Sequence, residues 1–435
     1  TARGGTGDGT VPGVADVAIF SKESGGQNSI ITSTIAVKGI IIEAYTGSLI
    51  QHGILGIGTS GLRMGSGTFV GGNFPITLSG SLTQTGGVMK YVQNSLTLSG
   101  SLSVTKASST VQSVHSNTGT LVFRGSKADQ NFTIGSSVIK TFKNLTINNR
   151  TGSTDDDVIA DISGGLFLSG ALVVTLGNLD LDTNDVNLVS RGPITIASTA
   201  QATLTSGANI TASGSIATGD AGSFTMNGST TLTMNGRGQN LDTNNAALYG
   251  VLISSGVTLT SPVRVFNTLT IGAGAALSLG AFTLNATGAT FTNNSFLYED
   301  TGKLVHSGSI LLAGPSYTEK ATFQSTDRVY ITLTDSDENI NANTADTVSA
   351  VLTIHGDSET VTLTETSATS GIFRSSIPSA TRFGSGSTNN GTIEASNNST
   401  LTITFTDAED ALVHTDTASL VVYNSVDSGG TSDTG

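Results

Sequence analysis

Short runs in which apolar and hydroxyl residues alternate recur along the first 300 residues. Ile76–Leu82 reads ITLSGSL, Leu96–Leu102 reads LTLSGSL twenty residues later, and Leu166–Leu172 reads LFLSGAL. An alternation with a period of two is typical of strands with one buried face. Each run closes with Ser-Gly, and we expect the glycine to supply the positive φ of a tight corner. A spacing near twenty favours one coil of a solenoid with two or three short strands.

A longer cycle of roughly one hundred residues lies over these runs. GTLVFRGS (Gly119–Ser126) and FKNLTINN (Phe142–Asn149) return in the same order as GSFTMNGS (Gly222–Ser229) and YGVLISSG (Tyr249–Gly256). A solenoid coil buries its inward side chains only when it is stacked on a neighbouring coil. The repeats therefore predict a parallel β-solenoid over residues 15–308. The prediction places Leu78, Leu98 and Leu168 inside it.

The pattern changes around Ser309–Glu319, where Pro315 interrupts it. Longer alternating runs follow, at 328–335, 347–356, 359–366, 371–377, 399–407 and 417–424. Strands of this length with turn residues between them predict a β-sandwich. We therefore divide the chain into an N-terminal extension (1–14), the solenoid (15–308), a sandwich (317–424) and a polar C-terminal tail (425–435).

Both predicted parts resemble known families. Residues 12–300 resemble the "GTLxFNG … FxNLTIN" arrays of large secreted bacterial surface proteins and adhesins. LTDSDEN (Leu333–Asn339), GDSETVTLTETSATSGIFRSSI (Gly356–Ile377) and LTITFTDAEDA (Leu401–Ala411) resemble immunoglobulin-like repeats of bacterial and archaeal S-layer proteins. The resemblance implies an all-β chain, with a parallel β-solenoid (β-helix) followed by a C-terminal immunoglobulin-like β-sandwich. The cysteine pair and core tryptophan of conventional immunoglobulin domains are missing.

Charge and composition narrow the partners. Only 12% of residues are charged and the formal net charge is −13, which disfavours nucleic acid because phosphate backbones would be repelled. No apolar run reaches 18 residues, so no membrane-spanning segment is predicted. Cysteine is absent, so disulfides say nothing about the compartment. The resemblance implies a secreted protein at the cell surface.

Acidic residues gather at the ends of the predicted sandwich strands. The candidate ligands for a metal ion are Asp335, Asp337, Asn339, Asp407 and Asp410. Ca²⁺ takes six to eight oxygen ligands, and an alternating D-x-D-x-N loop can direct several oxygens at one ion. A solvated turn is the alternative, since Asp and Asn are ordinary turn formers. Ca²⁺ is therefore a candidate cofactor.

Other chemistry receives less support from the sequence. Carboxylates cluster in the solenoid at Asp155–Asp157 and in LDLDTND (Leu179–Asp185), as in polysaccharide lyases, but solvated loops explain them as well. The five histidines have no metal-ligand spacing, and no nucleophile or phosphate-binding motif stands in its required context. We expect the chain not to be an enzyme.

These observations together favour a self-assembling extracellular structural protein, a subunit of an S-layer, sheath or filament. Copies of the same chain would be its partners, joined through intersubunit β contacts. An adhesin fragment that binds a host or glycan partner is the alternative, although the absence of tryptophan weakens glycan binding. A polysaccharide-active β-helix enzyme is a remote third possibility.

Overall fold

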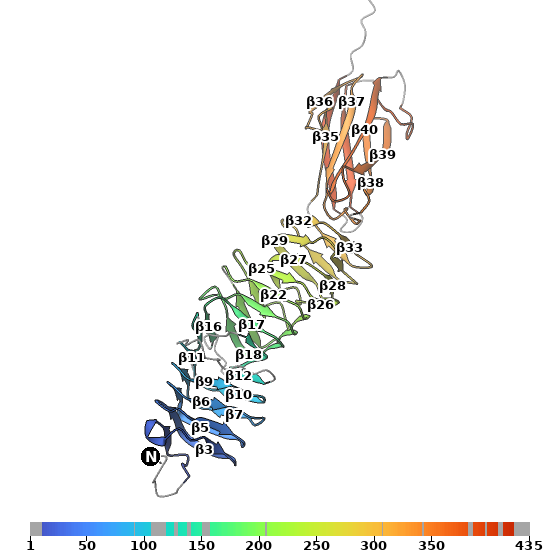
Figure 1. Cartoon of the computed structure of the whole chain (residues 1–435). Coiled ribbons are helices and arrows are strands. Elements are labelled where there is room, and N and C mark those ends of the chain that lie inside the picture. Colours follow the sequence, from blue (N-terminus) through green and yellow to red (C-terminus); the bar gives the residue numbers. More distant parts are fainter. Residues whose placement is uncertain are drawn as a thin grey trace, which may run out of the picture.

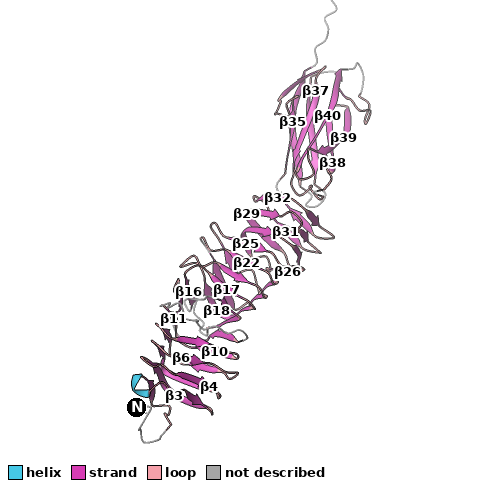
Figure 2. Ribbon diagram, in the orientation of Figure 1, coloured by secondary structure: helices cyan, strands magenta, loops and turns pink. Residues whose placement is uncertain are grey.

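The chain folds into β-strands with almost no helix. The computed structural model describes residues 11–90, 92–105, 119–125, 129–136, 141–149, 157–204, 207–306, 308–341, 343–381, 386–395, 398–407 and 412–421. A 3-10 helix, η1 (Lys22–Ser24), lies near the N-terminal end. A stack of coils leads from that end to a separate C-terminal sheet (Figures 1 and 2). None of the described helices is long and apolar enough to cross a membrane.

The stack is a parallel β-solenoid of about 12 turns, as predicted. One coil consists of β7 (Ile76–Leu78), β8 (Leu82–Gln84) and β9 (Val88–Lys90), and each strand pairs in parallel with strands of neighbouring coils. Strands such as β3 (Ile35–Ile42) run around a corner and so belong to two faces of the coil. A coil therefore has three faces.

Two of these faces form one continuous sheet. Its remaining strands are β1 (Val17–Phe20), β5 (Leu55–Met64), β10 (Ser95–Leu98), β11 (Leu102–Val104), β12 (Thr120–Phe123), β13 (Gln130–Ile134), β15 (Asn144–Asn148), β16 (Asp157–Ile162), β18 (Leu172–Asp180), β20 (Ile194–Ile196), β21 (Ala200–Leu204), β23 (Ile216–Thr218), β24 (Phe224–Met226), β26 (Gln239–Asp242), β28 (Gly256–Leu259), β30 (Ala276–Ser278) and β33 (Phe296–Tyr298).

Two shorter sheets follow one another along the third face, and the last strands of the second sheet extend around a corner onto a neighbouring face. The first has β2 (Ser29–Ile31), β4 (Ser48–Gln51), β6 (Thr68–Val70) and β9. The second has β14 (Thr141–Phe142), β17 (Leu166–Leu168), β19 (Leu188–Ser190), β22 (Ile210–Ala212), β25 (Thr231–Met234), β27 (Ala247–Ile253), β29 (Val263–Ile271), β31 (Thr283–Asn285), β32 (Thr290–Asn293) and β34 (Lys303–Val305).

The repeated leucines point into the solenoid, which confirms the prediction. Leu78 and Leu98 are 0% exposed and Leu168 is 2% exposed. Leu98 of β10 lies in register on Leu78 of β7, which matches the twenty-residue spacing of the motif. The third copy differs, because Leu168 belongs to β17 on another face of the coil. The Ser-Gly motif therefore marks a corner of the coil, and these copies lie at two different corners.

The glycines of these corners have a different role from the one expected. None of Gly80, Gly100 and Gly170 has a positive φ. A β-carbon at Gly100 would instead lie 2.7 Å from the carbonyl carbon of Gly80, in the coil below. The expectation of a left-handed corner was therefore wrong at these positions. Glycine is needed there because successive backbones stack too closely for a side chain.

Buried glutamines fasten some of these Ser-Gly corners. The Gln239 side-chain nitrogen donates to the carbonyl oxygens of Ala212 (3.1 Å) and Gly214 (2.6 Å), and its oxygen accepts from Gly236 N (2.6 Å). Gln130 binds the backbone in the same way, in an earlier coil. The amide thus satisfies backbone groups that the sharp bend removes from the strand ladder.

Replacing Gln239 by leucine should therefore destabilise this corner. The variant leaves three backbone groups without their partner at a site where the wild-type side chain is 2% exposed. We expect its free energy of unfolding to fall by about 3 kcal/mol, since each buried polar group that loses its hydrogen bond costs about 1–3 kcal/mol. Urea unfolding of the full chain measures this. Asn240→Leu, on an exposed neighbour, is the control.

The C-terminal strands form a mainly antiparallel sheet with its own core. The strands are β35 (Ser309–Ala313), β36 (Thr322–Gln324), β37 (Arg328–Thr334), β38 (Thr347–Ile354), β39 (Asp357–Glu365), β40 (Ile372–Thr381), β41 (Ile393–Ala395), β42 (Ser399–Thr406) and β43 (Val413–Val421). Six of them overlap the predicted runs. β35 pairs with β37, so this sheet begins upstream of residue 317.

The C-terminal sheet curves into a half-barrel. Its order is β35-β37-β40-β39-β38-β42-β43-β36, with β41 beside β40. The backbone nitrogen of Leu312 on β35 donates to the Asp416 carboxylate on β43, 2.7 Å away, so strands far apart in this order come together. The antiparallel arrangement is thus established, and the finer assignment to an immunoglobulin-like sandwich remains a prediction.

Candidate metal centre at the junction

Specific polar contacts join the last coil of the solenoid to the C-terminal sheet. The amide side chain of Asn293, at the end of β32, donates to the carbonyl oxygen of Asn339 (2.6 Å). The side chain of Asn339 donates in return to the carbonyl oxygen of Asn293 (3.2 Å). Phe296 of β33 forms an antiparallel bridge with Asn341. The loop that follows β37 is therefore held against the end of the solenoid.

Four of the five predicted ligands lie in or near this junction, and all four are buried. The exposed fractions are 0% for Asp335, 5% for Asp337, 2% for Asn339 and 1% for Asp407. Asp335 and Asp337 follow directly on β37, while Asp407 follows β42. The fifth predicted ligand, Asp410, lies outside the described residues. Burial argues against the alternative of a solvated turn at these four positions.

A histidine from the solenoid side completes the cluster. One ring nitrogen of His306 and one oxygen each of Asp335 and Asp337 lie within 4.8 Å of one another. His306 follows immediately on β34, in the last coil. The three residues therefore form a potential metal site that spans both parts of the protein. His306 could not be predicted as a ligand, because it lies far from Asp335 along the chain and no motif connects them.

The hydrogen bonding of His306 leaves one nitrogen available as a ligand. Its Nε2 atom lies 2.9 Å from the carbonyl oxygen of Ala289. A carbonyl oxygen can only accept, so Nε2 carries a proton, and Nδ1 has a free lone pair whenever the ring binds a metal ion. Nδ1 is buried and has no hydrogen-bond partner among the described residues. Such a carbonyl contact is the usual way in which a protein orients a metal-binding imidazole.

A second imidazole lies close to the same carboxylate. A β-carbon placed on Gly308 would be 2.7 Å from the carboxyl carbon of Asp335 and 3.2 Å from Nε2 of His414. The His414 Nε2 atom is also buried, again with no hydrogen-bond partner in the described part of the chain. Glycine at position 308 therefore leaves room for these two side chains to approach each other.

The pKa values of Asp335 and Asp337 are both raised, because too little positive charge in the described part of the chain compensates for the burial of their carboxyl groups. Burial, followed by the neighbouring Asp337 carboxyl group, raises the pKa of Asp335 to about 10, and the charge of Asp407 adds to this. Burial likewise raises the pKa of Asp337, although the neighbouring Asp335 and the charge of His306 oppose the rise. Both effects have the same origin, because a carboxylate loses hydration on burial and needs a cation or donors in return.

Other buried carboxylates of the C-terminal sheet do have such donors. One oxygen of Glu365 accepts from the backbone nitrogens of Ser370 (2.7 Å) and Gly371 (2.8 Å), and the other accepts from that of Asp346 (3.2 Å). By contrast, all four carboxylate oxygens of Asp335 and Asp337 lack a hydrogen-bond partner within the described residues. Glu365 therefore organises its loop, whereas the surroundings of the two aspartates suit metal ligands.

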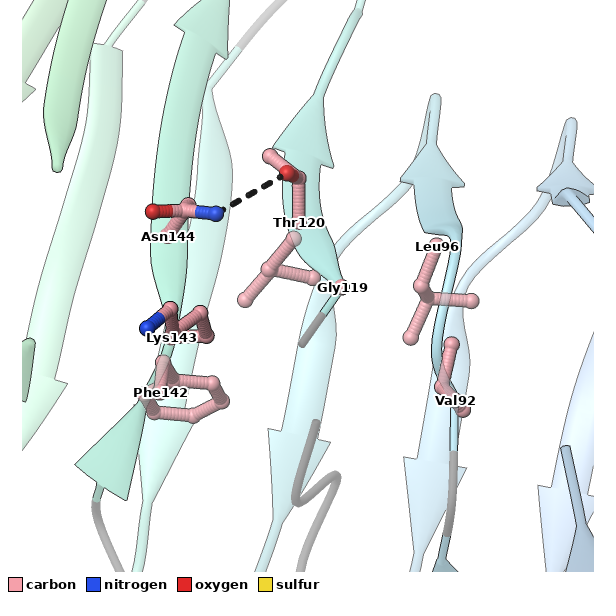
Figure 3. Close-up of a pocket in the computed structure, with 8 residues that line it drawn as sticks. Val92, Leu96, Gly119, Thr120, Phe142, Lys143 and Asn144 are labelled. Carbon is pink, nitrogen blue, oxygen red and sulfur yellow. Dashed lines mark hydrogen bonds between the residues drawn. The ribbon is translucent and has the colours of Figure 1, made fainter. Parts of the chain in front are cut away.

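The solenoid offers little sign of a second chemical site in its described part. Asp180, one of its clustered carboxylates, accepts from the backbone nitrogens of Asp182 and Thr183 and so closes its own turn. Asp155 and Asp156 lie outside the described residues. A small depression between coils, shown in Figure 3, is bounded by apolar side chains such as Leu96 and by an Asn144–Thr120 hydrogen bond. Among the described residues that line it, none is a carboxylate or a histidine.

Comparison with known proteins does not place this site in an established family. No protein-family model matches the chain, and a search of curated proteins gave no match.

Proposed function

We propose that this chain is a self-assembling extracellular structural protein, a subunit of a surface layer, sheath or filament. The observation that carries the proposal is the strand edge of the first described coil, at one end of a continuous stack. β1 pairs with β3 and β2 pairs with β4, and neither has a strand on its other side in the described residues. Open edges of this kind readily pair with another chain.

The opposite end of the solenoid differs, because the loop that follows β37 contacts its last coil. Asn339 and Asn341 contact the last coil there. The two ends of the described solenoid are therefore unlike each other, which favours a head-to-tail contact between copies. Such heterologous contacts generate open filaments or lattices whenever the rotation between copies does not close a ring. An edge strand of the C-terminal sheet is the natural partner for the β1–β2 end.

The C-terminal sheet suits the same role. We assign it to the immunoglobulin-like class of S-layer proteins, on the basis of the LTDSDEN, GDSETVTLTET and LTITFTDAEDA segments and of their antiparallel strands. Together with the acidic composition, this assignment supports a secreted location at the cell surface. The solenoid would then act as a spacer, and the sheet as the module that joins one copy to the next.

A charge on the open edge should block assembly. Ile30 lies in β2 and is 53% exposed. Ile30→Glu places a carboxylate where a neighbouring strand would pair, and charged edge residues prevent such pairing. We expect the variant to keep its circular dichroism spectrum but to pellet about tenfold less in an ultracentrifuge than the wild type.

Ile54→Glu is the matched control, because Ile54 is 44% exposed and its carbonyl oxygen already accepts a hydrogen bond from the backbone nitrogen of Ile35 in the coil below. It should pellet like the wild type. If Ile30→Glu assembled as well as Ile54→Glu, the β2 edge would not be the contact, and the proposal of edge pairing would be abandoned.

A further inference from the structure

We propose that a divalent cation binds His306, Asp335 and Asp337 and fixes the C-terminal sheet to the last coil of the solenoid. This site differs from the one expected from sequence, which lay wholly within the C-terminal sheet. The inference is independent of whether the chain assembles. It rests on the geometry of the junction and on the buried atoms that lack partners there.

The first step is that, in the forms that bind a metal ion, these groups can only accept hydrogen bonds. An ionised carboxylate has no proton to donate, and neither has Nδ1 of a histidine whose Nε2 is bonded to a carbonyl. Three such groups lie within 4.8 Å of one another, and the structure gives none of the acceptor atoms a donor among the described residues. A cation at their centre satisfies all three at once.

A nearby side chain supplies an independent observation. Asn339 is 2% exposed, and its nitrogen is committed to the solenoid backbone. Its Oδ1 atom has no partner in the described part of the chain. Asn339 stands two residues after Asp337 in the same loop, so an amide oxygen is available as a further ligand, as Ca²⁺ in particular prefers.

The second step is that both parts of the protein hold the ligands rigidly. His306 is fixed to the solenoid through Ala289, and its ring lies 6.0 Å from that of Phe291. Asp335 is fixed to the C-terminal sheet, because its backbone nitrogen donates to the carbonyl oxygen of Gly371 (2.8 Å). An ion between these side chains therefore bridges two bodies that are otherwise joined by a few polar contacts.

The ligands fit two kinds of cation, and an experiment is needed to distinguish them. Carboxylate and amide oxygens suit Ca²⁺, whereas an imidazole nitrogen beside two carboxylates suits Zn²⁺ and related ions. Calorimetric titration of the chelator-treated full chain with Ca²⁺, and separately with Zn²⁺, distinguishes them. We expect one ion to bind with a stoichiometry of one.

Three variants test which residues hold the ion. Asp337→Asn and His306→Gln should each weaken its binding about tenfold or more. Asp161→Asn, which removes an exposed carboxylate of the solenoid, should leave binding unchanged and so controls for attraction to the acidic surface. Circular dichroism confirms that each variant is folded. If neither ion bound the wild type, or if only Asp337→Asn lost binding, the bridging site would be refuted.

A distance measurement tests whether the ion fixes the C-terminal sheet to the last coil, a role that we call the clamp. Thr283→Cys on β31 and Thr360→Cys on β39 provide attachment points for two spin labels, one on each side of the junction. The chain has no cysteine of its own, so no other position is labelled. Adding the ion that binds should narrow the distribution of distances between the labels. The same addition to a labelled His306→Gln variant should not. An identical distribution with ion and with chelator would overturn the clamp.

Discussion

Replacing Leu78 by aspartate is expected to prevent folding of the solenoid. Leu78 is 0% exposed and lies in register between two apolar residues, Ile57 on the coil below and Leu98 on the coil above. An aspartate at this position would therefore face apolar side chains on both sides. A buried carboxylate without a partner costs several kcal/mol, which is a large part of the stability of a typical domain. We expect Leu78→Asp to give little soluble protein, and that protein to lack the strand signal of the solenoid in circular dichroism.

Thr77→Asp is the matched control for this variant. Thr77 precedes Leu78 in the same strand, but its side chain is exposed, because successive side chains of a strand point to opposite faces. The control should express and unfold like the wild type. A Leu78→Asp protein with an unchanged unfolding midpoint would show that β7 does not face a packed interior, and the register of the coils would have to be revised.

Replacing Gly192 by alanine is expected to destabilise the stack of coils strongly. A β-carbon there would lie 2.5 Å from the carbonyl carbon of Gly170, in the coil below. A β-carbon at Gly214 would meet the carbonyl carbon of Gly192 in the same way. The three glycines stack along one corner, and the atoms that a methyl group would meet belong to the backbone, which cannot rotate away.

The variant must therefore separate two coils or bend the corner. Overpacking of this kind costs about 3 kcal/mol. Urea unfolding followed by circular dichroism should show a lower midpoint for Gly192→Ala. Gly222→Ala is the control, because the nearest atom to a β-carbon there is a carboxylate oxygen of Asp220, at 3.6 Å. Equal midpoints for the two variants would contradict the proposed role of the stacked glycines.

The periodicity of the sequence was enough to predict most of the architecture. Alternation of apolar and hydroxyl residues identified both the short solenoid strands and the longer strands such as β37 and β42, because burial of one face imposes a period of two. It also placed Leu78 and Leu98 correctly inside the solenoid. The face occupied by Leu168 was not predictable in this way, because Ser-Gly corners occur at more than one position of the coil.

The metal centre was predictable only in part. Asp335, Asp337 and Asn339 stand together in one short loop, so their types and spacing indicated a cation ligand set. Their burial depends on the junction with the solenoid, which no local pattern encodes. His306 belongs to the last coil and reaches the cluster through tertiary packing. A lone histidine at the boundary between two predicted modules was the one available signal.

Electron microscopy of the purified full chain tests the central claim most directly. If the chain is a structural subunit that assembles through its open solenoid edge, fibres or ordered arrays should form as the protein concentration rises. They should be absent from the Ile30→Glu variant and present in Ile54→Glu. Separate rods at every concentration, including rods that bind cells or glycans, would contradict this account and favour an adhesin.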